Sequence, residues 1–220
     1  MTPHEGRTAS SAATADIHRI CRLGLVNEYL VAEEDGLTLI DTGLPGTHRL
    51  ILARAARLGM PIRRIALTHA HRDHTGSLAA LAAALPGVQL NVCEREAGLP
   101  GDVASAARFV ADGDSVGSLR AVATHGHTEG HLAFLDPRDG TLYAGDAFTA
   151  TRGVATSAVV PWHYPMAGLA TWNRELALDS ARRLRDLDPD RLATGHGPVV
   201  GAPRQAMDRA IAAAARRLGR

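Results

Sequence analysis

Lysine is absent from this chain of 220 residues, so all 24 basic residues are arginines and no lysine can act as a Schiff base or a general base. Cysteine is scarce, because only Cys21 and Cys93 occur, far apart in apolar runs. This indicates buried thiols rather than a disulfide framework. Long apolar runs are also missing, so the sequence predicts no segment that spans a membrane. These absences favour a cytoplasmic protein with reduced thiols.

A large excess of positive or negative charge is missing as well. The formal net charge is +1, so the chain has no basic field that would make a nucleic acid the expected partner. With 45% hydrophobic and 21% charged residues, the composition is that of a folded globular protein. Residues 1–15 are small and polar without the apolar core of a signal peptide, which predicts a disordered N-terminal tail. We therefore expect one domain over residues 16–220.

Histidine, in contrast, is concentrated in one short segment, 68–76, which reads THAHRDHTG. A short apolar run that favours a strand precedes it, and a helical pattern follows. Alternate side chains of an extended segment point the same way, so His69 and His71 can converge on one point. After the chain turns, Asp73 and His74 are directed at a neighbouring point. Imidazole and carboxylate groups are ligands for zinc, iron and manganese, so the segment predicts a metal site.

Further histidines and carboxylates follow short apolar strands elsewhere in the chain. These residues are Asp41, His125, His127, His131, Asp146 and His196. Strand ends can bring residues that are distant in the sequence around one site. From the residues alone, Asp41 also fits a turn or helix N-cap carboxylate, and His125 fits an exposed loop residue.

The motif H-x-H-x-D-H resembles the signature of the metallo-β-lactamase superfamily, and the later elements occur in the order that this family has. Alternating strands and helices indicate an α/β protein. The resemblance then implies a four-layer αββα sandwich of the metallo-β-lactamase type over residues 16–220. It also implies two metal sites and a bridging carboxylate: His69, His71 and His127 in one site, Asp73, His74 and His196 in the other, and Asp146 between them.

The same resemblance implies roles for neighbouring residues and a mechanism. Asp41 would lie beneath the metals and His131 beside the ligands as a structural residue. Two divalent ions, zinc first with iron or manganese as alternatives, would share a hydroxide that attacks a carbonyl group. Asp73 and Asp146 would be the catalytic carboxylates, Asp73 also as a proton shuttle.

The substrate of such a hydrolase is a small molecule, and we predict a lactone or an ester. Acyl-homoserine lactonases share the whole ligand set, although many carry a tyrosine three residues after the bridging aspartate, where this chain has Thr149. Thioesterases of the glyoxalase II type add a helical domain after the last histidine, and here only the short segment up to Arg220 follows. Thioester or β-lactam hydrolysis and a mononuclear iron persulfide dioxygenase are the alternatives. A non-enzymatic binding protein is disfavoured because no ligand is missing.

The segment 149–168 has little periodicity but contains large side chains, namely Trp162, His163, Tyr164 and Met166. It fits a packed surface loop and a substrate-covering segment equally well. After it, the spacing of Leu169, Trp172, Leu176 and Leu184 predicts a helix up to about Asp186. The oligomeric state stays open, with a homodimer as one option.

Overall fold

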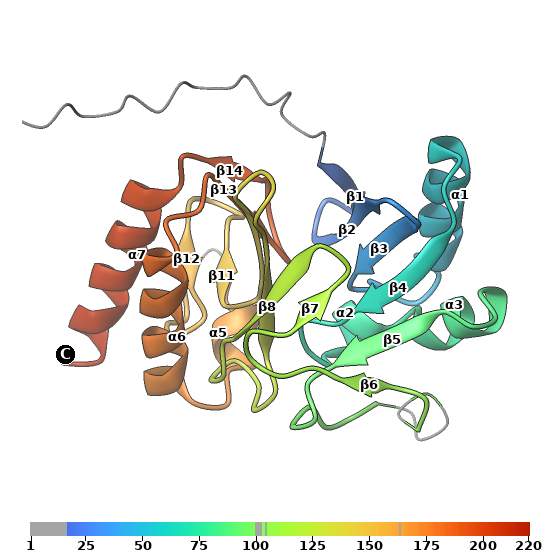
Figure 1. The fold of residues 1–220 in the computed structure, drawn as a ribbon. Helices are drawn as coiled ribbons and strands as arrows, with labels where there is room; N and C mark the ends of the chain where they lie inside the picture. Colours follow the sequence, from blue (N-terminus) through green and yellow to red (C-terminus); the bar gives the residue numbers. More distant parts are fainter. Residues whose placement is uncertain (1–16, 100–102, 104, 163) are drawn as a thin grey trace, which may run out of the picture.

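The computed structural model describes residues 17–99, 103, 105–162 and 164–220. Two six-stranded sheets face each other, and helices cover the outer face of each sheet (Figure 1). This arrangement confirms the predicted αββα sandwich. The predicted disordered tail at 1–15 and the predicted substrate residue His163 lie outside the described residues.

The first sheet is formed by the N-terminal half of the chain in sequence order: β1 (His18–Arg22), β2 (Val26–Glu33), β3 (Gly36–Ile40), β4 (Ile62–Ala66), β5 (Gln89–Val92) and β6 (Arg108–Phe109). The second sheet has the spatial order β14 (Val200–Gly201), β13 (Arg191–Thr194), β10 (Thr141–Gly145), β9 (Leu132–Asp136), β8 (Leu119–Ala123) and β7 (Ser115–Val116). A small separate ribbon pairs β11 (Phe148–Thr149) with β12 (Ala155–Thr156).

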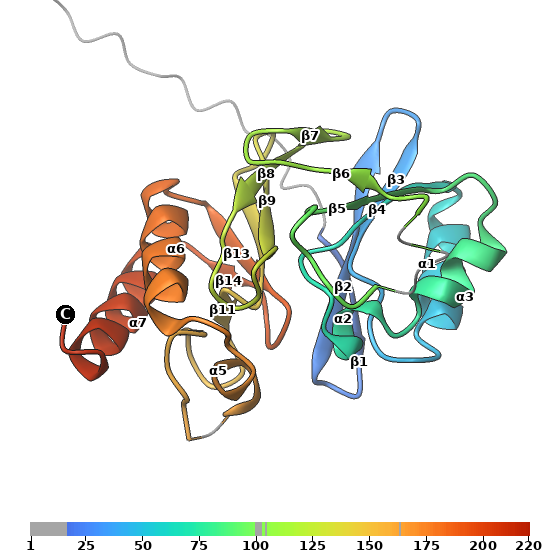
Figure 2. The same ribbon diagram turned by 90° about the horizontal axis from the view of Figure 1, so that it is seen from below.

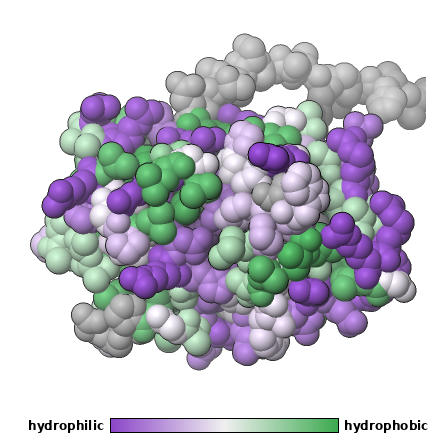
Figure 3. All heavy atoms as spheres, turned by 180° about the vertical axis from the view of Figure 1, so that it is seen from behind, coloured by the Kyte–Doolittle hydropathy of each residue, from purple (hydrophilic) through white to green (hydrophobic). Residues whose placement is uncertain are grey.

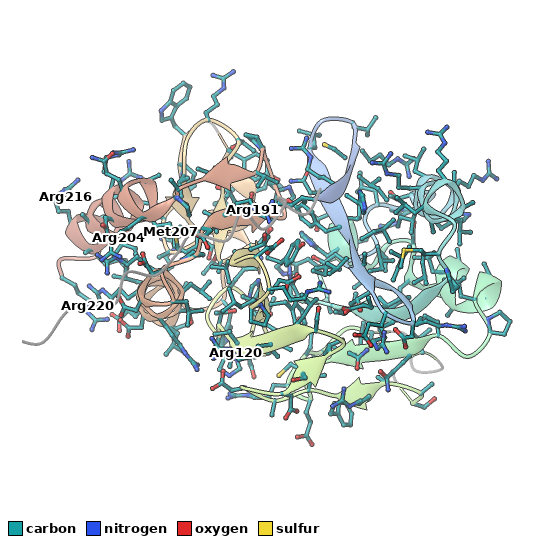
Figure 4. The ribbon with its side chains drawn as sticks, turned by 45° about the horizontal axis from the view of Figure 1, so that its top comes forward. Arg120, Arg191, Arg204, Met207, Arg216 and Arg220 are labelled. Atoms are coloured by element: carbon teal, nitrogen blue, oxygen red, sulfur yellow. The ribbon has the colours of Figure 1, made fainter. Side chains whose placement is uncertain are left out.

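Helices α1 (His48–Leu58) and α3 (Leu78–Ala84) pack on the first sheet, while α6 (Arg174–Asp186) and α7 (Arg204–Arg217) pack on the second. In α7 the apolar stripe faces inward: Met207 is fully buried on the side of the sheet, and Arg216 projects from the outer side of the helix (Figure 4). Two single-turn helices, α2 (Arg72–Thr75) and α5 (Met166–Leu169), lie with the β1–β2 turn along one face of the molecule (Figure 2).

The space between the sheets is filled by large apolar side chains from both, including Tyr29 and Ile40 of the first sheet and Phe134 and Tyr143 of the second. Strands β3 and β4 are parallel, as are β10 and β13. In each sheet, the segments that follow the two parallel strands therefore leave at the same edge of that sheet. There the Tyr29 hydroxyl donates to the Thr194 carbonyl at 2.7 Å, which ties the two sheets together beside the site.

The predicted helix from Leu169 to Asp186 is wrong at its start. The chain forms α5, breaks, and begins α6 only at Arg174. Asn173 has an extended backbone, and its side chain accepts hydrogen bonds from the Glu175 and Leu176 backbone N–H groups, so it caps α6. A capping side chain of this kind fixes where a helix begins, whatever the spacing of apolar residues before it.

Within the described ranges, no helix has the length and apolar character needed to cross a membrane.

Candidate metal centre

The histidine-rich segment after β4 changes conformation within a few residues. His71 still has an extended backbone (φ −63°, ψ 147°), and α2 begins directly after it at Arg72. The single turn of helix carries Asp73 and His74 away from the direction shared by His69 and His71. The local sequence thus divides four potential ligands between two neighbouring points, as the pattern predicts.

The structure brings all seven predicted ligands together. Three groups each place their ligand atoms within 4.8 Å of one another: His69, His71 and His127; His69, His74 and Asp146; and Asp73, His74 and His196. The Asp146 carboxylate lies between the other ligands, 3.4 Å from His74 Nε2, 3.2 Å from His196 Nε2 and 3.7 Å from His127 Nε2. The three groups share His69 and His74, so the first and the third could each hold one metal ion, with Asp146 between them.

Asp41 organises the histidines from beneath. Its carboxylate accepts hydrogen bonds from the Thr68 backbone N–H, the Thr68 hydroxyl and His74 Nδ1, each at 2.8 Å. Because the Thr68 hydroxyl gives its proton to Asp41, it can only accept from His69 Nδ1, 3.0 Å away. His69 and His74 therefore each carry a ring proton on Nδ1, and the Nε2 atoms of both face the centre.

Two further histidines are oriented in the same way from other elements. His196 Nδ1 donates to the Leu25 carbonyl at 2.8 Å. The Thr171 hydroxyl donates to backbone carbonyls and so accepts from His127 Nδ1 at 3.1 Å. In both rings Nε2 then faces the other ligands: His127 Nε2 lies 3.0 Å from His71 Nδ1, and His196 Nε2 lies 3.2 Å from the Asp146 carboxylate. Partners of this kind on the outer ring nitrogen are the usual companions of metal-binding histidines.

The centre fits a metal on its own geometry. His69 Nε2, His74 Nε2 and Asp146 Oδ1 are buried and have no hydrogen-bond partner. Burying such groups without a partner costs free energy, and coordination of a cation would satisfy all three. Seven nitrogen and oxygen ligands are compatible with zinc, iron or manganese, so this donor set does not select one metal.

His131 and Gly145 hold Asp146 in place. His131 Nε2 accepts from the Asp146 backbone N–H at 3.1 Å, while its Nδ1 lies 2.7 Å from the Thr124 hydroxyl. Gly145 has a left-handed backbone (φ 50°), and a Cβ there would lie 2.7 Å from Thr68 Cβ and 2.8 Å from His131 Nε2. Only glycine allows this close approach at a positive φ, so Gly145-Asp146 is fixed by both packing and backbone conformation.

The ionisation of the cluster follows from burial and from the nearest charges. Burial lowers the pKa of His69, and it lowers the pKa of His127 to about 4, so both rings are neutral. Burial also acts on His196, but Asp146 outweighs it and raises the pKa of His196 to about 10. For Asp146 burial opposes ionisation, yet His196 and His74 hold its pKa well below the usual value. A metal that binds here must displace protons, so its affinity falls as the pH is lowered.

Glu96, which follows β5, joins the two loops that carry the first metal group, and no sequence pattern identified it. Its carboxylate accepts from the Ala70 backbone N–H at 2.8 Å and from the Thr128 hydroxyl at 2.7 Å. A Cβ on Gly130 would lie 2.5 Å from the Glu96 backbone nitrogen, so the loops are in close contact. Ala70 lies between His69 and His71, and Thr128 follows His127, so Glu96 sets the spacing of three potential ligands.

We expect Glu96→Ala to weaken metal binding by about tenfold, the lower end of the range for residues that orient ligands. Alanine leaves the Ala70 N–H and the Thr128 hydroxyl without their acceptor. Glu96→Gln should keep most of the affinity, because its oxygen can accept from Ala70 while its amide donates to Thr128. Chelator competition measures the affinity, with the exposed neighbour Glu94→Ala as the control. Equal affinities in the alanine variant and the wild type would contradict this role.

The other predicted residues lie around the cluster. The Tyr164 ring is 5.0 Å from the His196 ring, whereas Trp162 and Met166 are 83% and 62% exposed. Thr149, at the position where many lactonases carry tyrosine, is buried and pairs with Ala155 in the small ribbon. Tyr164 therefore brings a phenol to the centre from a different segment.

Comparison with known proteins identifies the family. A family model described as the metallo-beta-lactamase superfamily matches residues 21–196. The uncharacterized protein YobT of Bacillus subtilis is 40% identical over 207 residues, which cover 84% of this chain and 89% of YobT. A hydroxyacylglutathione hydrolase of Gloeobacter violaceus is 31% identical over 139 residues, 61% of this chain and only 53% of that protein.

A solved structure extends the similarity to the fold. TTHA1623, solved in a di-iron-bound form, superposes with a TM-score of 0.66 at 25% identity, covering 87% of this chain and 96% of that one. The family model covers most of the chain, and it includes every strand end that carries a predicted ligand. The chain therefore belongs to the metallo-β-lactamase superfamily and is a metal-dependent hydrolase of that family.

Proposed function

We propose that the chain hydrolyses a lactone or an ester at a centre of two metal ions. His69, His71 and His127 would hold one ion, and Asp73, His74 and His196 the other. The observation that carries the proposal is the position of Asp146, whose two oxygens lie within 3.7 Å of histidine Nε2 atoms from both groups. A carboxylate that lies between two clusters of potential ligands is suited to bridge two cations.

Metal ions bound at these residues would lower the pKa of a bound water to about 7 and polarise a substrate carbonyl oxygen. The chain supplies the groups that move protons and orient the substrate. Asp73 is the most accessible carboxylate of the centre, with 35% of its side chain exposed, and it can take a proton from the attacking water and pass it on. Burial and the negative charges of Asp146 and Asp73 raise the pKa of Tyr164, so its hydroxyl keeps its proton and can donate to a substrate oxygen.

Thioester hydrolysis is the second candidate, and a specific observation favours it. The similarity to the hydroxyacylglutathione hydrolase of Gloeobacter violaceus extends over 61% of this chain. Lactones, esters and thioesters share a carbonyl group attacked by water, so the same residues serve all three. Zinc is the expected metal, and iron is supported as an alternative by the similarity to the di-iron form of TTHA1623.

Elemental analysis of protein purified without added metal, followed by a substrate panel, tests the proposal. We expect two metal ions per chain and hydrolysis of lactones or esters in preference to β-lactams and phosphodiesters. A preference for thioesters would select the second candidate. One iron per chain, together with oxygen uptake in the presence of a persulfide, would show that the protein is a dioxygenase and not a hydrolase.

A further inference from the structure

Large apolar side chains that remain exposed are concentrated beside the metal centre. Among the described residues, nine such side chains are exposed, and six of them lie in only two short segments. One segment is the β1–β2 turn and the other is 162–172, around α5. We call these six the apolar rim: Leu23, Leu25, Trp162, Met166, Leu169 and Trp172. Such a concentration marks a binding surface, whereas single exposed apolar residues need no explanation.

The β1–β2 turn presents its leucines at a conformational cost. The Leu25 N–H donates to the Arg22 carbonyl, and the central residues of this turn, Leu23 and Gly24, both have positive φ values of 56° and 68°. Asparagine or glycine is favoured in that conformation, and a bulky residue there is an outlier. Leu23 is nevertheless 75% exposed, so packing in the core does not account for it. Leu25, two residues further on, accepts a hydrogen bond from the His196 ring through its carbonyl oxygen.

The second segment lies between β12 and α6 and contacts the centre through His127, which follows β8 of the second sheet. The Trp172 backbone N–H donates to the His127 carbonyl at 3.0 Å, and Thr171 accepts from the His127 ring. Trp162, Leu169 and Trp172 are 83%, 64% and 53% exposed. Both segments of the rim are thus fixed to residues of the metal centre. The face on which α2, α5 and the β1–β2 turn lie is in view in Figure 3, where hydrophobic residues gather in separate areas with paler and purple ones between them.

We infer that the apolar rim binds the hydrocarbon chain of an amphiphilic substrate, so that the reactive carbonyl is the polar end of a medium or long acyl compound. This inference rests on the proposed function and specifies its substrate class. The occupant is a substrate rather than a second copy of the protein, because each of the two segments is hydrogen-bonded to a histidine of the centre, Leu25 to His196 and Trp172 to His127. A hydrocarbon chain between them places its carbonyl end at the metals.

Intrinsic tryptophan fluorescence directly reports ligand binding to the rim, because both tryptophans of the chain, Trp162 and Trp172, lie in it. Decanoate added to the metal-loaded protein should shift the emission to shorter wavelength at concentrations at which butanoate has no effect. Butanoate has the same carboxylate, so it controls for binding to the metal alone. In a series of straight-chain acyl substrates, kcat/KM should rise by roughly two- to fourfold per methylene group, as expected for partial to full burial of each group.

Matched variants connect this dependence to the rim. The double variant Met166→Ser, Leu169→Ser should flatten the dependence of kcat/KM on chain length and weaken the fluorescence response to decanoate. Phe109→Ser removes an apolar side chain that is 57% exposed on β6, outside the rim, and should change neither. Circular dichroism and metal content confirm that each variant is folded and loaded.

The outcomes separate this inference from the proposed function. If hydrolysis were independent of acyl chain length and decanoate caused no fluorescence response, the inference that the apolar rim binds an acyl chain would be wrong. The proposed hydrolase function would still hold. Decanoate binding without hydrolysis of any substrate in the panel would support the rim and contradict the proposed function. A blue shift that grows with protein concentration alone, with a dimer in size-exclusion chromatography, would assign the rim to a second copy and overturn the inference.

Discussion

Asp146→Asn should reduce hydrolysis by orders of magnitude and release or weaken one metal ion, while the fold survives. Asparagine keeps the shape of this buried side chain but removes the negative charge that lies between His74 and His196. Two cations brought close together then repel each other without compensation, and the amide nitrogen cannot act as a ligand. The backbone N–H of residue 146 still donates to His131, so the loop itself is retained.

A structural carboxylate would behave differently. Loss of a capping or turn carboxylate costs about 0.5–2 kcal/mol of stability and leaves activity and metals in place. Asp139 is the matched control, because it lies in the turn before the same strand β10, where it accepts from the Thr141 N–H and pairs with Arg191. Asp139→Asn should lower the melting temperature without changing metal content. Two bound metals and near-normal kcat in Asp146→Asn would refute the bridging role.

The convergence of the candidate ligands after β4 could be predicted because it depends on one short segment. Histidines at alternate positions of an extended segment, followed by one turn of helix, are brought near one another by the local backbone conformation, and distant residues such as Asp41 then orient their rings. Asp146 and His196 were assigned to the site by the resemblance to a family, and the structure shows that the strands before them, β10 and β13, are parallel and end at one edge. The resemblance to a family supplied the sandwich architecture, which periodicity alone does not distinguish from other α/β folds.

Glu96 and four of the six residues of the apolar rim escaped the sequence analysis for a physical reason, whereas Trp162 and Met166 belong to the segment that it named as a candidate substrate cover. Glu96 acts through hydrogen bonds to Ala70 and Thr128, which are distant in the sequence and belong to no shared pattern. Leu169 and Trp172 have the spacing of a buried helix face, but periodicity does not say what covers such a face. In the structure the chain breaks at Asn173, and Leu169 and Trp172 are exposed beside the centre.

Asp41→Asn should weaken metal binding by about 10- to 100-fold, the range for groups that orient metal-binding histidines. The Asp41 carboxylate accepts three hydrogen bonds, two from Thr68 and one from His74 Nδ1. Whichever way an asparagine amide is turned, its NH₂ group faces at least one of these donors. His74 or Thr68 then loses its acceptor, and with it the hydrogen bond that fixes the Nε2 lone pair of His74 or His69 toward the metals.

The choice of asparagine isolates this effect from the backbone. Asp41 has a left-handed conformation (φ 58°), which asparagine tolerates as well as aspartate does, whereas alanine would add strain. A buried donor left without an acceptor costs about 1–3 kcal/mol, so the metal-free protein should also unfold at a lower temperature. Chelator competition and thermal unfolding in EDTA measure the two effects separately.

Asp35→Asn provides the comparison, since Asp35 is an exposed carboxylate paired with Arg64 on the same sheet. Exposed pairs of this kind contribute little to stability, so this variant should match the wild type in metal affinity. If Asp41→Asn also bound metals as tightly as the wild type, Asp41 would be a turn carboxylate. The orientation of His69 and His74 would then depend on the bound metals rather than on the hydrogen bonds beneath them.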